Sequence, residues 1–294
     1  MLSRIQLLLC VIFWGWTFVA TKVVLEHVTP VELLGLRFIL GLPVLYAVIR
    51  IKRLKFDFTR KNWIGVAIGS AIITIHFLVQ VTGLKYTSAT NTGWIISVTP
   101  LVMAVLSYFI LKEQIGARQI LGIVFATVGI LLLVSRGDLT SLDWLSSIGD
   151  WLVLISAHTW ALYTIATRDL SRARNPLAVT FGVLTPSGIL VLAYMAFTSD
   201  WGSFLEMPLE ANLALLFLGV LGLAVAHWFW QEGVADIGAS RAGIFLYLEP
   251  VATTALAVPY LDERFGWATA VGGLMVLGGV YWGSRRRKAR TFPQ

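Results

Sequence analysis

Two stretches of this chain match each other at a distance of 150 positions: LKEQIGARQILGIVFATVGILLL at residues 111–133 and LDERFGWATAVGGLMVLGGVYW at residues 261–282. In both, an acid follows the leading leucine by two residues, a glycine opens an apolar run, and further glycines are spaced seven apart. Such a match indicates an internal repeat. The matching pairs are Leu111 with Leu261, Glu113 with Glu263, Gly116 with Gly266, Gly122 with Gly272 and Gly129 with Gly279.

The repeat continues outward from these stretches over the rest of the chain. Identities are sparse, but the order of the matches is unbroken, so we expect two related units, residues 1–137 and 138–294. The further pairs are Trp14 with Trp160, Lys22 with Arg168, Pro30 with Pro176, His76 with His227, Gln80 with Gln231 and Pro100 with Pro250.

The composition is that of a membrane protein. Hydrophobic residues make up 57% of the chain, charged residues make up 13%, and the mean hydropathy is +0.78, whereas a soluble domain has about 25% charged residues. Ten apolar stretches are long enough to cross about 30 Å of hydrocarbon as helices, and their continuous rather than alternating pattern excludes a β-barrel. They lie near residues 3–24, 30–50, 63–82, 88–111, 116–135, 149–168, 178–198, 210–230, 240–260 and 265–284.

We therefore predict an all-α polytopic membrane protein whose ten transmembrane helices form two inverted five-helix repeats. Each unit would cross the bilayer an odd number of times, so the second unit must enter from the opposite side. In such proteins a binding site lies between the repeats, near the middle of the membrane. The connections between the apolar stretches leave no room for a soluble catalytic domain.

Basic residues determine the expected orientation. With the N-terminus in the cytoplasm, 18 of the 23 Lys and Arg residues lie on the cytoplasmic side and four lie on the other side. This asymmetry predicts that both termini are cytoplasmic. The runs RIKRLKFDFTRK (50–61) and RRRKAR (285–290) are also typical of nucleic-acid or phosphoinositide binding. Because the orientation rule already accounts for both runs, we expect no nucleic-acid partner.

Polar residues deep in the expected spans are the first candidates for a binding site, because polarity at that depth is costly and usually serves a cavity. His76 and Gln80 lie one helical turn apart, and so do their repeat partners His227 and Gln231. Each pair therefore shares a helix face. Their imidazole and amide groups can hydrogen-bond a carboxylate or an ammonium group of a substrate. The alternative is that they bridge helices and satisfy one another.

Aromatic residues form a second set of candidates. Six tryptophans at span ends fit an interfacial belt, namely Trp63, Trp144, Trp151, Trp201, Trp267 and Trp282. Others lie deeper, where they either stack on a planar substrate or a cation or serve only in packing. Together with nearby hydroxyl groups, the substrate-binding candidates are Trp14, Thr17, Trp94, Ser97, Trp160, Tyr163, Phe245 and Tyr247.

Two charged residues lie inside expected spans. Glu249 stands near the centre of the ninth, directly before Pro250. It either carries a proton or bonds a substrate ammonium group, or it is kept neutral where solvation is poor. We group Glu249 with His76 and His227 as candidates for proton coupling or gating. Arg37, about two turns into the second span, is expected to snorkel outward or to pair with Glu32, with a weaker case for a place in the site.

The repeated stretches also contain candidates for structural roles. Glu113 and Glu263 each precede a helix, so capping of that helix is favoured over a gating ion pair. The glycines offer smooth faces for close helix approach. Packing of the fifth and tenth helices on their own halves is favoured over homodimerisation. These glycines are Gly122, Gly129, Gly272, Gly273, Gly278 and Gly279.

The repeated stretches, the pair Arg37–Phe38 in the second span and the tryptophan-led first helix of each unit resemble the EamA-type permeases of the drug/metabolite transporter superfamily. The likeness spans essentially the whole chain and is greatest with bacterial aromatic amino acid exporters. It implies a ten-helix exporter of the inner membrane, with peripheral fifth and tenth helices and the others around a central cavity. Arg37–Phe38 has no counterpart in the second unit, where position 183 is valine.

The expected function is secondary transport, in which amino acids, aromatic ones favoured, or similar small metabolites are exported by alternating access. No GxxxxGK[ST] loop occurs, so no ATPase subunit is evident. We expect no cofactor, no metal and a monomer, and both proton antiport and facilitated diffusion stay open. A lipid scramblase or flippase and a multidrug exporter are rival functions. An intramembrane enzyme is disfavoured because Ser156 and His158, two residues apart, point to different helix faces.

Overall fold

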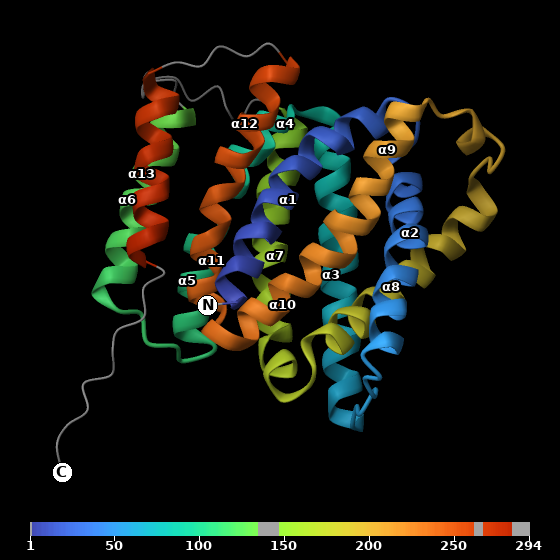
Figure 1. Cartoon of the computed structure of the whole chain (residues 1–294), viewed down its shortest axis with the longest axis horizontal. Coiled ribbons are helices and arrows are strands. Elements are labelled where there is room, and N and C mark those ends of the chain that lie inside the picture. Colours follow the sequence, from blue (N-terminus) through green and yellow to red (C-terminus); the bar gives the residue numbers. More distant parts are fainter. Residues whose placement is uncertain (1, 135–146, 262–266, 284–294) are drawn as a thin grey trace.

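The computed structural model describes residues 2–134, 147–261 and 267–283 of the chain (Figure 1). The regular structure in these ranges is helical. In chain order the elements are α1 (Leu2–Leu25), α2 (Pro30–Ile51), α3 (Arg60–Tyr86), α4 (Ala89–Ile96), α5 (Thr99–Phe109), α6 (Ala117–Val134), α7 (Ile148–Ala173), α8 (Pro176–Thr198), η2 (Ser203–Glu206), α9 (Leu209–Phe217), η3 (Leu218–Val225), α10 (Ala226–Ile237), α11 (Ala239–Gly243), η4 (Ile244–Leu248), α12 (Glu249–Leu261) and α13 (Trp267–Gly283).

Each of the ten expected spans overlaps a helical segment of the described ranges. Six of these segments are long and apolar enough to cross a membrane, namely α1, α2, α3, α4 with α5, α8, and α9 through α10. The apolar parts of α6 and α13 that the structure describes are shorter. The α11–α12 segment is interrupted by η4. α7 is less apolar because Ser156, Thr164 and Thr167 lie on its buried face.

Capping boxes fix where three of the described helices begin, namely α2, α3 and α7. At the start of α2, the Thr29 amide donates to Glu32 Oε2 at 2.8 Å, and the Glu32 amide donates to Thr29 Oγ1 at 3.4 Å. Ser147 and Asp150 make the same pair of bonds before α7, at 2.9 and 3.1 Å. Because each box satisfies amides that the first helical turn leaves free, these helices begin at the residues that the sequence marks.

Two spans lose α-helical geometry just before a proline. α4 ends at Ile96, and α5 begins at Thr99 with Pro100 in its first turn. In the second unit, the 3-10 helix η4 precedes Glu249 and Pro250. Proline lacks an amide hydrogen and clashes with the preceding turn, so both breaks follow from the sequence. They leave Thr99 and Glu249 at the bends.

The eighth span contains an irregularity that the sequence analysis missed. η3 is a π-helix, and it contains two glycines at close contacts with other helices. A Cβ atom at Gly219 would lie 2.5 Å from Leu40 Cβ, and one at Gly222 would lie 2.7 Å from Thr17 Cγ2. These glycines let α2 and α1 approach the widened turn. The sequence signal for this irregularity was the pair Gly219 and Gly222 within a run of larger apolar residues.

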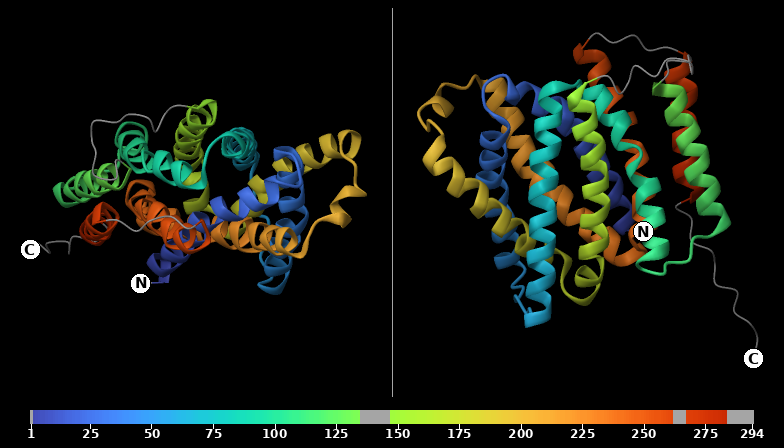
Figure 2. Two further views of the ribbon diagram at one scale, coloured as in Figure 1. Left: turned by 90° about the horizontal axis from the view of Figure 1, so that it is seen from above. Right: turned by 180° about the vertical axis from the view of Figure 1, so that it is seen from behind.

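α6 and α13 stand side by side at one end of the molecule (Figures 1 and 2). A Cβ atom at Gly122 would lie 2.7 Å from the Gly279 carbonyl oxygen, and one at Gly129 would lie 2.7 Å from that of Gly272. The glycine faces therefore serve internal packing. The expectation that each helix docks on its own half is wrong, because these matching faces fit closely against each other across the two units.

The remaining helices surround the centre. α1 packs on α9, α10 and α12, and α3 runs along α7. The α2–α3, α5–α6, α7–α8 and α10–α11 connections lie at one face, the lower one in Figure 1. Of the tryptophans expected in an interfacial belt, Trp144 lies outside the described residues and the side chain of Trp267 is not described. The other four are exposed: Trp63, Trp151, Trp201 and Trp282.

Candidate functional site

A pocket lies inside the bundle, lined by helices of both sequence units. Its empty space, including the part that opens outward, is about 450 Å³. Seven of the residues singled out from the sequence line it: Trp14, Thr17, His76, Gln80, Trp160, His227 and Glu249. The other lining residues are Phe18, Arg37, Phe77, Ile96, Thr99, Ala157 and Leu246.

Aromatic rings from four helices make up one wall of this pocket. The rings of Trp14 in α1 and Trp160 in α7, which are repeat partners, meet edge to face with centroids 4.8 Å apart. Trp14 also lies 5.2 Å from the His227 ring, and Trp160 lies 5.0 Å from that of His76. The Trp14 indole donates to the Gly222 carbonyl of η3 at 3.1 Å. Aromatic contacts of this kind stabilise the packing of the wall.

The two histidines have the same hydrogen-bonding pattern. His76 Nδ1 lies 3.0 Å from the Ser156 carbonyl oxygen, and His227 Nδ1 lies 3.1 Å from that of Gly222. Because a carbonyl oxygen only accepts, each Nδ1 carries the hydrogen, and a neutral ring presents Nε2 as an acceptor. His227 Nε2 is buried without a partner. Both rings thus offer acceptors for an N–H or O–H group of a ligand.

Arg37 lies in the pocket, not at the membrane surface. Its side chain is 5% exposed, and its guanidinium carbon lies 5.5 Å from the centre of the Phe77 ring. Glu32 instead caps the start of its own helix through Thr29. The expectation that Arg37 snorkels outward or pairs with Glu32 is therefore wrong. Arg37 lies too far from the end of α2 for its side chain to reach the membrane surface, so its guanidinium group is buried inside the bundle.

Glu249 also faces the pocket. It is 3% exposed, and its backbone oxygen accepts from Thr253 Oγ1 at 2.9 Å. Thr253 Oγ1 also donates to the Gly15 carbonyl at 2.8 Å, and a Cβ atom at Gly15 would lie 2.7 Å from the Glu249 carbonyl oxygen. Close contact between α1 and α12 thus places the carboxylate. In the part of the chain that the structure describes, no three His, Cys, Asp or Glu side chains group closely enough to hold a metal.

The two glutamines of the repeated pairs differ in their surroundings. Gln80 lines the pocket. Gln231 does not. It accepts from Ser171 Oγ at 2.7 Å and donates to Tyr163 Oη at 2.8 Å and Thr167 Oγ1 at 3.1 Å. For Gln231 and Tyr163 the structure matches the helix-bridging alternative, because their polar groups are consumed between α7 and α10.

Four further aromatic and hydroxyl candidates lie outside the pocket lining. Ser97 Oγ donates to the Trp94 carbonyl within the break after α4. Phe245 and Tyr247 are buried in η4, and the Tyr247 hydroxyl lies 2.8 Å from Thr127 Oγ1 of α6. In this conformation these residues pack helices together instead of lining the pocket. Their aromatic character was a sequence signal, but the sequence could not tell which way the rings point.

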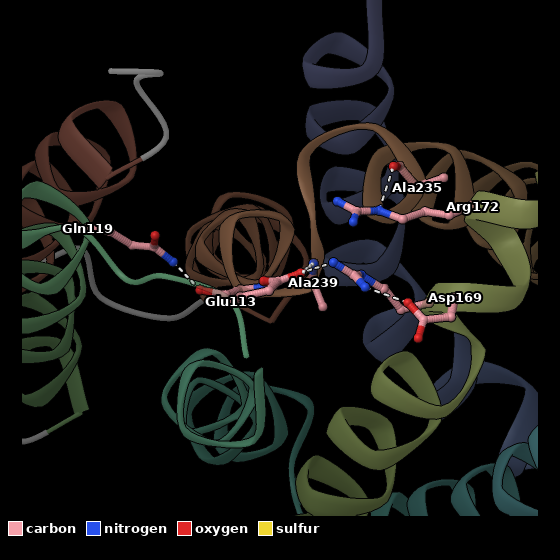
Figure 3. Close-up of polar contacts among 8 residues, drawn as sticks. Glu113, Gln119, Asp169, Arg172, Ala235 and Ala239 are labelled. Atoms are coloured by element: carbon pink, nitrogen blue, oxygen red, sulfur yellow. Dashed lines mark hydrogen bonds and ion pairs between the residues drawn. The ribbon is translucent and has the colours of Figure 1, made fainter. Parts of the chain in front are cut away.

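Glu113 joins three elements at the face that holds the α5–α6 connection (Figure 3). It forms an ion pair with Arg168 of α7 at 3.0 Å and accepts from the amides of Ala239 and Ser240 at 3.3 and 3.2 Å. Gln119 of α6 also bonds Ser240. The expectation that Glu113 caps the helix following it is wrong. It caps α11 of the other unit and is ion-paired as well. Glu263 lies outside the described residues.

Of the remaining lining residues, the sequence analysis raised only Arg37, as a weaker candidate. Phe18, Phe77, Ile96 and Leu246 are apolar residues in apolar helices, so no local pattern distinguishes them. Arg37 did have a signal, since a charge inside a span is costly and commonly functional.

Comparisons with known proteins agree with this architecture. The model of the EamA-like transporter family matches residues 1–135 and again residues 147–285. The uncharacterized transporter YyaM of Bacillus subtilis (strain 168) is 29% identical over 272 residues, covering 92% of this chain and 87% of that protein. The "Probable amino-acid metabolite efflux pump" of Escherichia coli (strain K12) is 25% identical over 293 residues, covering 96% and 95%.

A solved structure, described as "Crystal structure of protein", shares the fold with a TM-score of 0.78 at 18% identity, covering 96% of this chain and 98% of that chain. The double family match covers almost all of the sequence. The chain therefore belongs to the EamA-like transporter family of the drug/metabolite transporter superfamily, whose members are multi-pass membrane transporters.

Proposed function

We propose that this protein exports amino acids, with a preference for aromatic ones, from the cytoplasm by alternating access. The pocket is the observation that carries the proposal, because it lies inside a transporter bundle and is lined by both sequence units. The relative in Escherichia coli that is named as an amino-acid metabolite efflux pump supports this class of substrate.

The chemistry of the pocket suits a planar or amphipathic solute. Trp14 and Trp160 offer ring faces and edges against which an aromatic side chain packs. The Nε2 acceptors of His76 and His227 are placed to receive hydrogen bonds from an amine. Hydrophobic walls with a few convergent polar groups are typical of small-molecule sites. A lipid scramblase requires instead a groove that is open to the bilayer.

The proposed arrangement is two inverted halves, residues 1–137 and 138–294, in a monomer of the bacterial inner membrane. Basic residues are concentrated in the α2–α3 connection and after α13, so we assign that face, and with it both termini, to the cytoplasm. Glu113 of the α5–α6 connection, which lies at the same face, forms an ion pair with Arg168 of α7. It then ties the two units together on the cytoplasmic side of the pocket.

The test is counterflow with purified protein in liposomes that are preloaded with one unlabelled amino acid at a time. Saturable uptake of the same labelled amino acid, driven only by exchange, is the expected result. Replacing Trp160 with Ala should weaken apparent affinity, whereas Trp63→Ala, at an exposed position outside the pocket, should not. Failure of every amino acid tried, or lipid movement between leaflets without any solute exchange, contradicts the proposal.

A further inference from the structure

We propose that Arg37 and Glu249 are the two charged poles of the pocket, and that they bind the carboxylate and the ammonium group of one zwitterionic solute. The inference rests on the proposed transport function. It assigns the carboxylate and the ammonium group of the proposed substrate to two named residues of the pocket.

Arg37 is a buried cation that no anion of the described residues pairs with. In the described ranges no carboxylate lies within ion-pair distance of its guanidinium group, and Nε is buried without an acceptor. Its contact with the Phe77 ring does not neutralise the charge. Guanidinium stays protonated and presents a planar fork that matches a carboxylate. Since an unpaired buried charge is costly, a carboxylate brought by the solute is the partner that this site lacks.

Glu249 is the complementary case. Its side chain lines the same pocket, and no cation or hydrogen-bond donor among the described residues contacts its carboxylate. It also forms no ion pair with Arg37, so the two opposite charges leave each other unneutralised. A single ligand with two separated charges of opposite sign can satisfy both residues at once.

The side chains near Arg37 and Glu249 favour the same placement of the solute, with its carboxylate at Arg37 and its ammonium group at Glu249. The other titratable side chains that line the pocket are His76 and His227, whose neutral rings present acceptors. Acceptors add hydrogen bonds to an ammonium group, whereas Arg37 supplies only donors. A lone amine would leave Arg37 unpaired, and a lone acid would leave Glu249 unpaired. The pocket should therefore reject both.

Calorimetric titration of the purified protein in lipid nanodiscs tests this with three matched series. Phenylalanine, leucine and threonine are each compared with the amine that lacks the carboxylate and with the acid that lacks the ammonium group. In at least one series the zwitterion should bind about tenfold or more tightly than either analogue, because each lost charged hydrogen bond is worth about that factor. This comparison uses the unmodified protein, so it does not depend on the folding of any variant.

Two substitutions then assign the poles. Arg37→Gln should lower the affinity for the zwitterion about tenfold and leave the affinity for the amine unchanged. Glu249→Gln should also lower the affinity for the zwitterion about tenfold, but should leave the affinity for the acid unchanged. Arg37→Lys, which keeps the charge but not the fork, should fall between wild type and Arg37→Gln. Asp150→Asn removes a buried carboxylate at the start of α7, away from the pocket, and should leave all affinities unchanged.

The inference is overturned if no zwitterion binds, if an amine or acid binds as tightly as its parent amino acid in every series, or if both substitutions weaken all three ligands equally. Exchange measurements in liposomes separate this result from a failure of the proposed function. Solute exchange without zwitterion preference overturns only the assignment of the poles, whereas the absence of any exchange overturns transport.

Discussion

Individual residues inside the bundle differ in whether the protein itself supplies their hydrogen-bond partners. Gln231 bonds three side chains, those of Tyr163, Thr167 and Ser171. His227, four residues earlier in α10, uses Nδ1 for a carbonyl and leaves Nε2 free. A buried polar group is normally satisfied, so an unsatisfied one beside a pocket indicates binding. Gln231 therefore maintains the structure, and we propose that His227 binds the ligand.

The first prediction concerns this contrast. Gln231→Leu should lower the free energy of unfolding by about 1–3 kcal/mol, because three buried hydroxyl groups each lose one hydrogen bond, while substrate affinity stays close to that of wild type. His227→Leu should have the opposite effect. It should lower substrate affinity and change the free energy of unfolding little. Thermal unfolding and ligand titration of both variants provide the measurements. Loss of binding in a Gln231→Leu protein of unchanged stability would show that Gln231 contacts the ligand.

At the residue scale, the sequence predicted best the location of aromatic rings and histidines that are both deep in a span and repeated. Trp14, Trp160, His76 and His227 are repeat partners inside spans, and the structure brings all four to one pocket. The sequence did not predict the direction of Tyr247, whose side chain points to α6. The side-chain direction depends on the 3-10 geometry of η4, and this rotates the residues away from the face that α-helical spacing assigns to them.

Pairs of elements are held together by features that span the two sequence units. α6 and α13 meet through glycines, and Gly279 lies against Gly122 and Ala126. The sequence indicated close packing but not the partner, because a smooth helix face fits any other smooth face. The packing of the whole bundle determines which two helices meet. A side chain inserted at this contact must separate the two helices.

The second prediction tests the contact. Gly279→Leu should destabilise the protein by about 1–3 kcal/mol through overpacking, since its Cβ atom would lie 2.6 Å from the Gly122 carbonyl oxygen. Gly273→Leu on the same helix is the matched control, because nothing lies within 4 Å of a Cβ atom there. The measurement is the unfolding temperature in detergent. Equal effects of the two substitutions would contradict the packing of α6 on α13.

The third prediction concerns the link from Glu113 to α11. Glu113→Ala should accelerate hydrogen exchange at the amides of Ala239 and Ser240, because both lose their acceptor. Glu113→Gln keeps an acceptor oxygen but loses the charge, so it should accelerate exchange less. Asp169→Asn is the control, since Asp169 also pairs with Arg168 but is exposed. Unchanged exchange in Glu113→Ala would mean that the carboxylate does not cap α11.

Some features of the whole fold are determined by local sequence, whereas others depend on packing between helices that are distant in the chain. The ten helical segments were predictable, because a bilayer demands apolar stretches of fixed minimum length and internal backbone hydrogen bonds. The breaks at Pro100 and Pro250 were predictable for the same local reason. The position of Arg37 beside Phe77 and Gly222 was not, because it depends on how α2, α3 and η3 pack together.

Alternating access is tested most directly by the chemical accessibility of the pocket from each side of the membrane. Ala157 lines the pocket from α7, and the chain has one cysteine, Cys10, which is buried. A cysteine at position 157 in a Cys10→Ala background can be labelled with a membrane-impermeant maleimide in intact cells and in inside-out vesicles. We predict labelling from both faces, slowed in both by a transported amino acid. Labelling from one face only, or labelling from both faces without protection by any solute, would contradict a pocket that opens alternately to the two sides.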